Sequence, residues 1–129
     1  MAIARDTTAA NIKPLAGAVV RRFTSGAAIA AGEIVEVQSD GYVDPAIATA
    51  AVIRKIGIAI QVAAAAGVAV DVVMHGPVKC LTGASPGALV YVSDTAGEPS
   101  ETTGTKGTVI GYSESAGVLY VQPQIVNFT

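Results

Sequence analysis

The sequence contains a degenerate internal duplication of short β-like runs. The segment AGEIVEVQSDG (31–41) corresponds to PGALVYVSDTAG (86–97), and both read as glycine, strand and polar turn. Each is followed by a glycine-centred apolar run, IGIAI (56–60) or VIGY (109–112), and then by Ala-Gly and a valine-rich strand, 68–72 or 118–121. We therefore expect two copies of one strand-loop-hairpin unit. A chain built from repeated strands with little polar chemistry between them favours a scaffold or binding module over an enzyme.

The apolar residues of this chain are mostly small. Hydrophobic residues make up 51% of the 129 positions but aromatic residues only 5%, so the core is expected to consist of Ala and β-branched side chains. Charged residues make up 14% and the mean hydropathy is +0.53, values that leave little charge for a monomer surface. We expect another chain to cover some of the apolar surface. The longest apolar stretch, 56–70, is too short to span a bilayer, and no signal peptide is indicated.

Charge is unevenly placed along the chain. In residues 1–22 four basic residues and one acidic residue give +3, whereas the other four basic and nine acidic residues give −5. Residues 1–17 have Pro14 and no sustained period, so we predict an extended N-terminal arm whose order depends on a partner, followed by a single β domain over 18–129. The alternative is a frayed chain end without a role.

Strand and turn signals alternate over the rest of the chain. About nine short strands are expected, among them 19–23, 34–38, 42–43, 56–62, 68–72, 78–81 and 118–121. His75-Gly76-Pro77 is expected to break the strand before it, and residues 97–107 form the most polar, loop-like segment. The helix-start pattern Asp44-Pro45 before an Ala-rich run allows one short helix over 44–54. The predicted fold class is an all-β compact barrel or sandwich with two degenerate repeats and at most one short helix.

Residues capable of catalysis are few. His75 is the only histidine, and a triad with Asp71 lacks a nucleophile motif nearby, so a strand-end role is favoured. Cys80, the only cysteine, is expected to be a small buried hydrophobe, and a chain with one cysteine forms no internal disulfide. The carboxylate pairs Glu33/Glu36 and Glu98/Glu101 are expected to keep strand edges soluble. We predict no catalytic residue, no metal site and no cofactor.

The overall pattern of residues 18–126 resembles the small capsid decoration proteins of tailed bacteriophages, also called head-stabilising or cement proteins. The matching features are the basic arm, Thr24-Ser25-Gly26, the run from Ile29 to Val35, Gly41-Tyr42-Val43, Gly76-Pro77-Val78 and the second repeat through Val121. The resemblance implies a non-enzymatic homotrimer on the outside of an expanded capsid, made in the host cytoplasm, that clamps neighbouring major capsid proteins. Four basic residues among 1–22 in an otherwise acidic chain give a weak electrostatic footprint, so we expect no nucleic acid partner, and we also expect no membrane or small-molecule partner.

In such proteins an N-terminal arm often contacts the capsid. The resemblance therefore makes residues 2–15 the candidate capsid-binding arm, with Arg5 and Lys13 suited to pair with acidic groups on the shell. The full set of candidate arm residues is Ile3, Arg5, Ile12, Lys13 and Pro14. An extended arm can also add a strand to the exposed sheet edge of a neighbour.

Two alternatives stay open at this stage. Similar Ala-, Gly- and Thr-rich β domains serve as trimeric modules of phage tails or fibres, and the sequence does not separate tail from capsid attachment. An enzymatic alternative is a carrier or hydrolase accessory, because residues 32–37 are faintly similar to biotinyl-type domains. The modified lysine that those domains need at a hairpin tip is missing.

Overall fold

The computed structural model describes residues 3–47, 56–105 and 108–122. It is all-β, as the sequence predicts. The strands of the first part are β1 (Ala4–Arg5), β2 (Lys13–Pro14), β3 (Val19–Thr24), β4 (Ile34–Val37), β5 (Val43–Pro45) and β6 (Ile56–Ala59), and a single 3₁₀ turn, η1, covers Ala9–Asn11. The strands that follow are β7 (Ala69–Lys79), β8 (Leu81–Thr82), β9 (Leu89–Val92), β10 (Pro99–Ser100), β11 (Val109–Ser113) and β12 (Val118–Val121).

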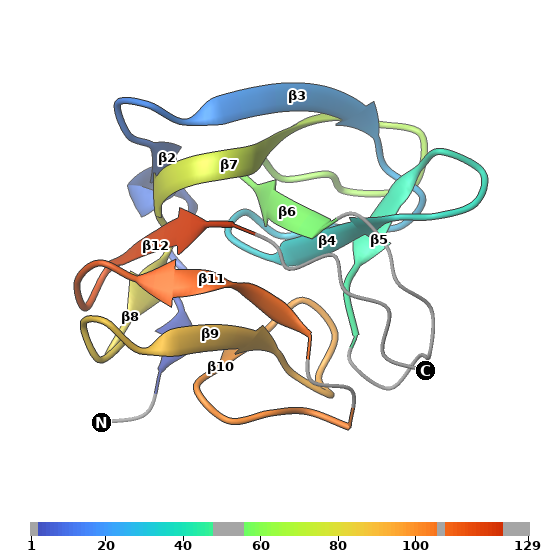
Figure 1. The fold of residues 1–129 in the computed structure, drawn as a ribbon. Helices are drawn as coiled ribbons and strands as arrows, with labels where there is room; N and C mark the ends of the chain where they lie inside the picture. Colours follow the sequence, from blue (N-terminus) through green and yellow to red (C-terminus); the bar gives the residue numbers. More distant parts are fainter. Residues whose placement is uncertain (1–2, 48–55, 106–107, 123–129) are drawn as a thin grey trace.

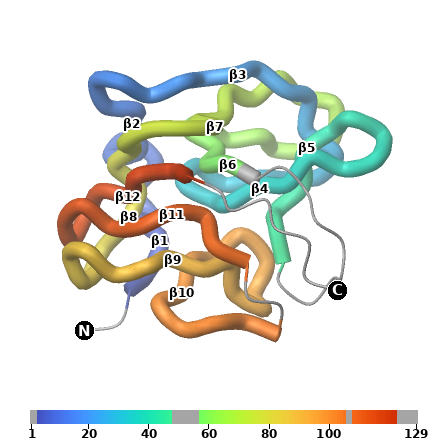
Figure 2. Tube along the Cα trace, in the orientation of Figure 1, coloured from blue at the N-terminus to red at the C-terminus, as the bar shows by residue number. Residues whose placement is uncertain are grey.

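Ten of these strands form one curled antiparallel sheet. Its path runs β10-β9-β11-β12-β7-β6-β4-β5, and β2 and β3 also pair with β7. In the orientation of Figure 1, β3, β7, β6, β4 and β5 occupy the upper part and β12, β11, β9 and β10 the lower part. The continuous trace in Figure 2 shows the N-terminal segment running upward beside both parts before it enters β3. β1 and β8 form a separate two-stranded sheet.

The duplication predicted from the sequence is present in the backbone pairing. In the first repeat, residues 31–79, β4 pairs with β6 so that Val35 lies opposite Gly57. In the second repeat, residues 86–121, β9 pairs with β11 so that Val90 lies opposite Gly111. The turn before each unit is closed by the same bond, because the Gly32 and Gly87 N–H groups donate over 2.7 Å to the carbonyls of residues 59 and 113. The sheet order is therefore palindromic, with β5-β4-β6-β7 matched by β10-β9-β11-β12.

The last strand of each repeat is aligned differently from the sequence comparison. The order of Ala-Gly pairs equates Val68 with Val118, but the pairing places Ala59 opposite Val72 and Ser113 opposite Leu119. The reason is loop length, since residues 60–68 join β6 to β7 whereas only residues 114–117 join β11 to β12. Val72 and Leu119 are thus equivalent, and so are Val73 and Tyr120.

The predicted break at His75-Gly76-Pro77 is wrong. β7 continues through these residues and changes neighbours there: its first half pairs with β3 and β6, and its second half pairs with β2 and β12. Gly76 has a φ of 102°, and a Cβ at this position would lie 2.8 Å from the Gly17 carbonyl oxygen. The glycine is needed for this close approach of the chain at residues 17–18, and it bends the strand that joins the two repeats without ending it.

Two apolar cores lie on opposite faces of the first repeat. One core contains Val35 and Val72 together with Ile29, Val43, Ala59, Ala63 and Val70. The other core contains Ile34, Ile58 and Val73 and is completed by the inner face of the second repeat, Val90, Val92, Ile110, Leu119 and Val121. Because these parts of β4, β6 and β7 are buried on both faces, each strand has two adjacent buried apolar residues, Ile34-Val35, Ile58-Ala59 and Val72-Val73.

The helix-start pattern at Asp44-Pro45 is misleading. Both residues belong to β5, where Asp44 lies opposite Glu36 and Pro45 opposite Val35. Pro45 is tolerated because β5 is an edge strand that needs no N–H donor there. The rest of the predicted helix, residues 48–54, lies outside the described residues.

Candidate functional site

The residues predicted to form the capsid-binding arm lie on the protein's own body. β1 pairs with β8, and β2 pairs with the second half of β7, so the segment is hydrogen-bonded at both ends. Ile12 is only 7% exposed and belongs to the core that the second repeat completes, and Ile3 packs against the same core. The buried Ile12 side chain contacts a partner only if the segment leaves the body.

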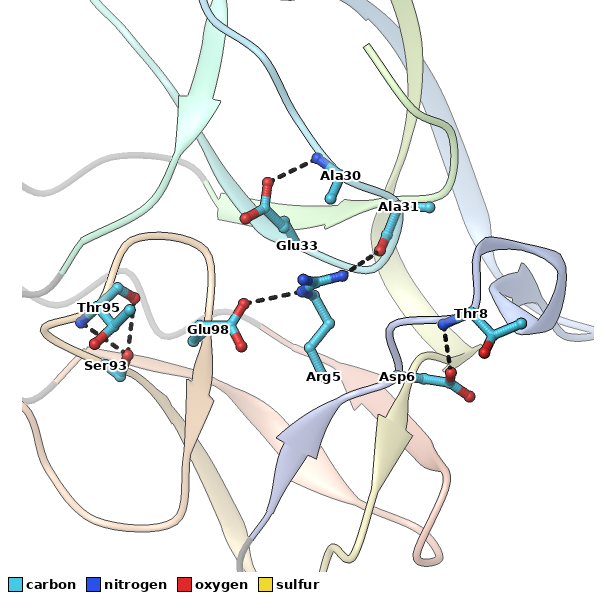
Figure 3. A network of polar contacts seen from close by, with 9 residues as sticks. All are labelled: Arg5, Asp6, Thr8, Ala30, Ala31, Glu33, Ser93, Thr95 and Glu98. Atoms are coloured by element: carbon cyan, nitrogen blue, oxygen red, sulfur yellow. Dashed lines mark hydrogen bonds and ion pairs between the residues drawn. The ribbon is translucent and has the colours of Figure 1, made fainter. Parts of the chain in front are cut away.

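Arg5 connects the N-terminal segment to both repeats. Its Nε atom donates to the Glu98 carboxylate over 2.9 Å, and one of its terminal NH groups donates to the Ala31 carbonyl oxygen over 3.2 Å. Figure 3 shows the guanidinium between Glu98 of the second repeat and the turn at Ala30 and Ala31 of the first. The Arg5 side chain is 16% exposed, so most of its surface is buried inside the molecule, where its charge is paired with Glu98.

Asp6 attaches the segment to the residue between β7 and β8 and bonds two later residues of the segment. The Asp6 N–H donates to the Cys80 carbonyl oxygen over 2.9 Å, and the Asp6 carboxylate accepts from the Thr8 N–H and the Asn11 side-chain amide. The Asp6–Thr8 bond is drawn in Figure 3. Removing residues 1–15 would therefore open the core at Ile12 as well as removing an arm, and such a deletion does not isolate the binding role of the arm.

Lys13 and Pro14 are the two candidate arm residues with exposed side chains. Lys13 lies directly opposite Lys79 on β7, so two cationic side chains share one face of adjacent strands. All ten carboxylate side chains lie in the described ranges, and the ion pairs found there are Arg5–Glu98 and Arg22–Asp71. No described carboxylate therefore forms an ion pair with Lys13 or Lys79, which we call the lysine pair.

A row of larger side chains crosses the outer face of the second repeat beside the lysine pair. Successive strands place Leu89 opposite Tyr112, Tyr112 opposite Tyr120, and Tyr120 opposite Pro77. We call these four residues the tyrosine row. Leu89 is 51% exposed and Tyr112 36%. The two tyrosine rings stack with centroids 5.4 Å apart, and the His75 ring meets Tyr120 edge to face at 5.5 Å.

Sequence reasoning missed the tyrosine row, although a signal was present. Tyr112 and Tyr120 occupy the positions that Ile58 and Val73 hold in the first repeat. Substitution of a buried aliphatic residue by an amphipathic aromatic one in the second copy indicates a surface that is not buried in the fold. The prediction that His75 ends a strand is wrong, because His75 lies inside β7, which continues to Lys79.

Asp71 and Cys80, the two remaining candidates for catalysis, both lie in surroundings that indicate a structural role. The Asp71 carboxylate accepts from the Arg22 Nε atom over 2.9 Å, an ion pair that raises the pKa of Arg22. Cys80 is buried, and burial first and the Asp6 charge second raise the pKa of its thiol to about 12. The thiolate is therefore scarce at neutral pH, which matches the expected structural role of Cys80.

The four carboxylates that we expect to keep strand edges soluble are buried or bonded within the fold. Glu36 is only 7% exposed, and Glu98 pairs with Arg5. Glu33 accepts from the Ala30 N–H over 2.8 Å and Glu101 from the Ser85 N–H over 2.9 Å, so both close loops. Across residues 3–47, 56–105 and 108–122, no group of three or more His, Cys, Asp or Glu side chains is arranged to hold a metal ion.

Comparison of the sequence with protein-family models found no matching family, and comparison with curated proteins found no match. Within the described residues, no helix has the length and apolar character required to cross a bilayer.

Proposed function

We propose that this chain is a structural virion protein that binds the outer surface of an expanded phage capsid. The observation that carries the proposal is the duplication across residues 31–121, whose pairing is repeated from Val35–Gly57 to Val90–Gly111. The resemblance to capsid decoration proteins depends on the same two repeats. A rigid, repeated β body suits a protein whose task is to bridge fixed neighbours.

The proposed mechanism is stabilisation by linkage. A protein that binds the assembled lattice and not the free capsid subunit stabilises the lattice by mass action, and no bond is made or broken. Three copies in a homotrimer would attach through several weak contacts at once, which raises the overall affinity above that of any single contact. The partner is the major capsid protein, and the protein moves from the host cytoplasm to the capsid exterior.

The exposed side chains bear on how attachment could occur. Lys13 and Pro14 stay available to a partner, whereas Ile3, Arg5 and Ile12 serve the body. Binding through the surface of the folded body, with Lys13 at its edge, is therefore favoured over binding through a free arm.

The first test is the molar ratio of this chain to the major shell protein in purified particles of the encoding phage, measured by quantitative mass spectrometry. A ratio near one is expected. A ratio of a few per cent would support the tail or fibre alternative instead, and absence from the particles would overturn both. In parallel, adding the purified protein to undecorated expanded shells should raise the temperature at which they disrupt.

A further inference from the structure

Equivalent rows of the two repeats differ in whether they are covered. In the first repeat Ile34, Ile58 and Val73 are at most 1% exposed, because the inner face of the second repeat packs on them. In the second repeat the equivalent residues are Leu89, Tyr112 and Tyr120, and the first two are 51% and 36% exposed. The same face of the same unit is thus a packing surface in one copy and an open surface in the other.

A second copy of this chain cannot cover the tyrosine row in the way that the second repeat covers the first. The second repeat covers the first with its inner face, which contains Val90 and Leu119. The equivalent face of the first repeat, around Val35 and Val72, is already covered by other residues of the same chain: Ile29, Val43, Ala63 and Val70. Among the described residues, neither repeat therefore has an inner face left open for a second molecule. A surface of different composition is therefore needed to cover the row.

The charges beside the tyrosine row indicate which chemical groups the covering surface carries. Like charges directly opposite each other on adjacent strands destabilise a sheet, and Lys13 faces Lys79 in this arrangement. Lys79 also lies opposite Val118, two residues from Tyr120, which puts the lysine pair on the same face as the tyrosine row. An anionic group placed against the two ammonium groups would remove this repulsion.

The ring geometry favours a protein over a nucleic acid. Stacking of bases needs open aromatic faces. Tyr112 and Tyr120 stack on each other at an interplanar angle of 22°, and His75 abuts Tyr120 at 81°, so the rings use their faces on one another. Exposed tyrosine edges beside leucine and valine side chains match the mixed apolar and hydrogen-bonding character of protein interfaces.

We propose that the tyrosine row and the lysine pair together form the surface through which this protein docks on a partner protein, and that the partner places carboxylates against Lys13 and Lys79 and apolar side chains against Leu89 and Tyr112. The inference rests on the proposed function, in which the partner is the major capsid protein. The docking face of this protein is then the outer face of the second repeat, and the matching site on the shell is acidic and apolar.

The test is co-sedimentation with undecorated expanded shells of the encoding phage. One double variant is Leu89→Ser/Tyr112→Ser, with the exposed Tyr42→Ser as its control; the other is Lys13→Glu/Lys79→Glu, with the exposed Arg21→Glu as its control. We expect each double variant to bind about tenfold more weakly or worse, because a few central residues carry most of an interface's affinity. The controls should stay within about twofold of the unmodified protein. Thermal unfolding of every variant verifies that it is folded.

The outcomes separate this inference from the proposed function. Failure of the unmodified protein to bind shells sinks the proposed function. Normal binding by both folded double variants sinks the docking face and leaves the function standing. Light scattering that shows loss of an oligomer in Leu89→Ser/Tyr112→Ser, with shell binding retained, would assign the row to a self-interface. Binding of a labelled single-stranded oligonucleotide that the same variant abolishes would also overturn the inference.

Discussion

The two repeats share a backbone plan and differ in what covers it. The pairs Ile34–Ile58 and Val35–Gly57 of β4–β6 correspond to Leu89–Tyr112 and Val90–Gly111 of β9–β11, and the correspondence ends at the register shift between Val109 and Gly111. Ile34 is nevertheless 1% exposed and Leu89, its equivalent, 51%. The first repeat is buried on both faces and the second on one. Because the backbone pairing is the same and the burial differs, equivalent substitutions in the two repeats can be compared. A difference between their effects on stability then reports side-chain packing and not backbone geometry.

The largest effect is expected from truncating Ile34, which lies in the buried row of the first repeat. Ile34→Ala should lower the free energy of unfolding by about 3.5 kcal/mol, because a fully buried side chain is lost and a cavity remains. Leu89→Ala removes a side chain of the same size from a half-exposed position and should cost less than about 1 kcal/mol. Urea denaturation of the two variants measures the difference. Similar costs would mean that the second repeat is also covered in solution.

Gly57 and Gly111 occupy equivalent positions, and substitutions there test the strand pairing that the two repeats share. A Cβ at Gly57 would lie 2.6 Å from the Val73 carbonyl oxygen, and a Cβ at Gly111 would collide with the carbonyl oxygen of Tyr120, the equivalent residue. We expect Gly111→Ala to cost about 3 kcal/mol and Gly57→Ala about 2 kcal/mol, because the neighbouring strand has to move.

Gly41→Ala is the matched control for the two glycine variants. Gly41 has a φ of 85° and no atom within 4 Å of an added Cβ, so only the left-handed backbone conformation is penalised, by about 1 kcal/mol. Both β-strand glycines should exceed this control in urea denaturation. A cost at Gly57 or Gly111 below that of Gly41 would show that the strands are further apart than the pairing indicates.

Local sequence patterns predicted the shared part of the repeats and not the part that distinguishes them. Glycine spacing and alternating valines fixed the strands because both depend on neighbours within a few residues. Gly76 was misread as a strand break because the reason for it, the approach of Gly17, comes from 59 positions earlier in the chain. Ile12 is expected in a free arm for the same kind of reason, since it is buried in a core whose other residues lie between positions 31 and 121.

The candidate site shows the same limit. Lys13 is a candidate through the resemblance to decoration proteins and through its charge, but its position opposite Lys79 requires the β2–β7 pairing, and Pro14 beside it gives no hint of a sheet. The sequence alignment of residues 56–60 with 109–112 already equates Ile58 with Tyr112. The equivalence of Val73 and Tyr120 requires the hydrogen-bonded pairing, because the Ala-Gly pairs align Val68 with Val118 instead.

The smallest expected effect concerns how the N-terminal segment holds the two repeats together. Arg5 bonds Glu98 of the second repeat and the Ala31 carbonyl of the first, and both ion-pair side chains are partly shielded from water, at 16% and 34% exposure. Arg5→Ala should lower the free energy of unfolding by about 1.5 kcal/mol, which reflects the loss of charge-assisted bonds in a partly buried site. Arg22→Ala, which breaks the exposed pair with Asp71, should be indistinguishable from the unmodified protein.

Cys80 reports whether Arg5 acts by holding the segment in place. The Asp6 N–H bonds the Cys80 carbonyl, and the pKa of the thiol is raised to about 12 by burial and, secondarily, by the Asp6 charge. If the segment detaches more often in Arg5→Ala, both causes weaken, the pKa falls and the thiolate becomes more abundant at pH 8. The rate of reaction with an aromatic disulfide reagent should then rise in Arg5→Ala and stay unchanged in Arg22→Ala. Equal rates in the two variants would mean that pairing of β1 with β8 and burial of Ile12 hold the segment without help from the ion pair, and that Arg5 contributes only to the fit between the two repeats.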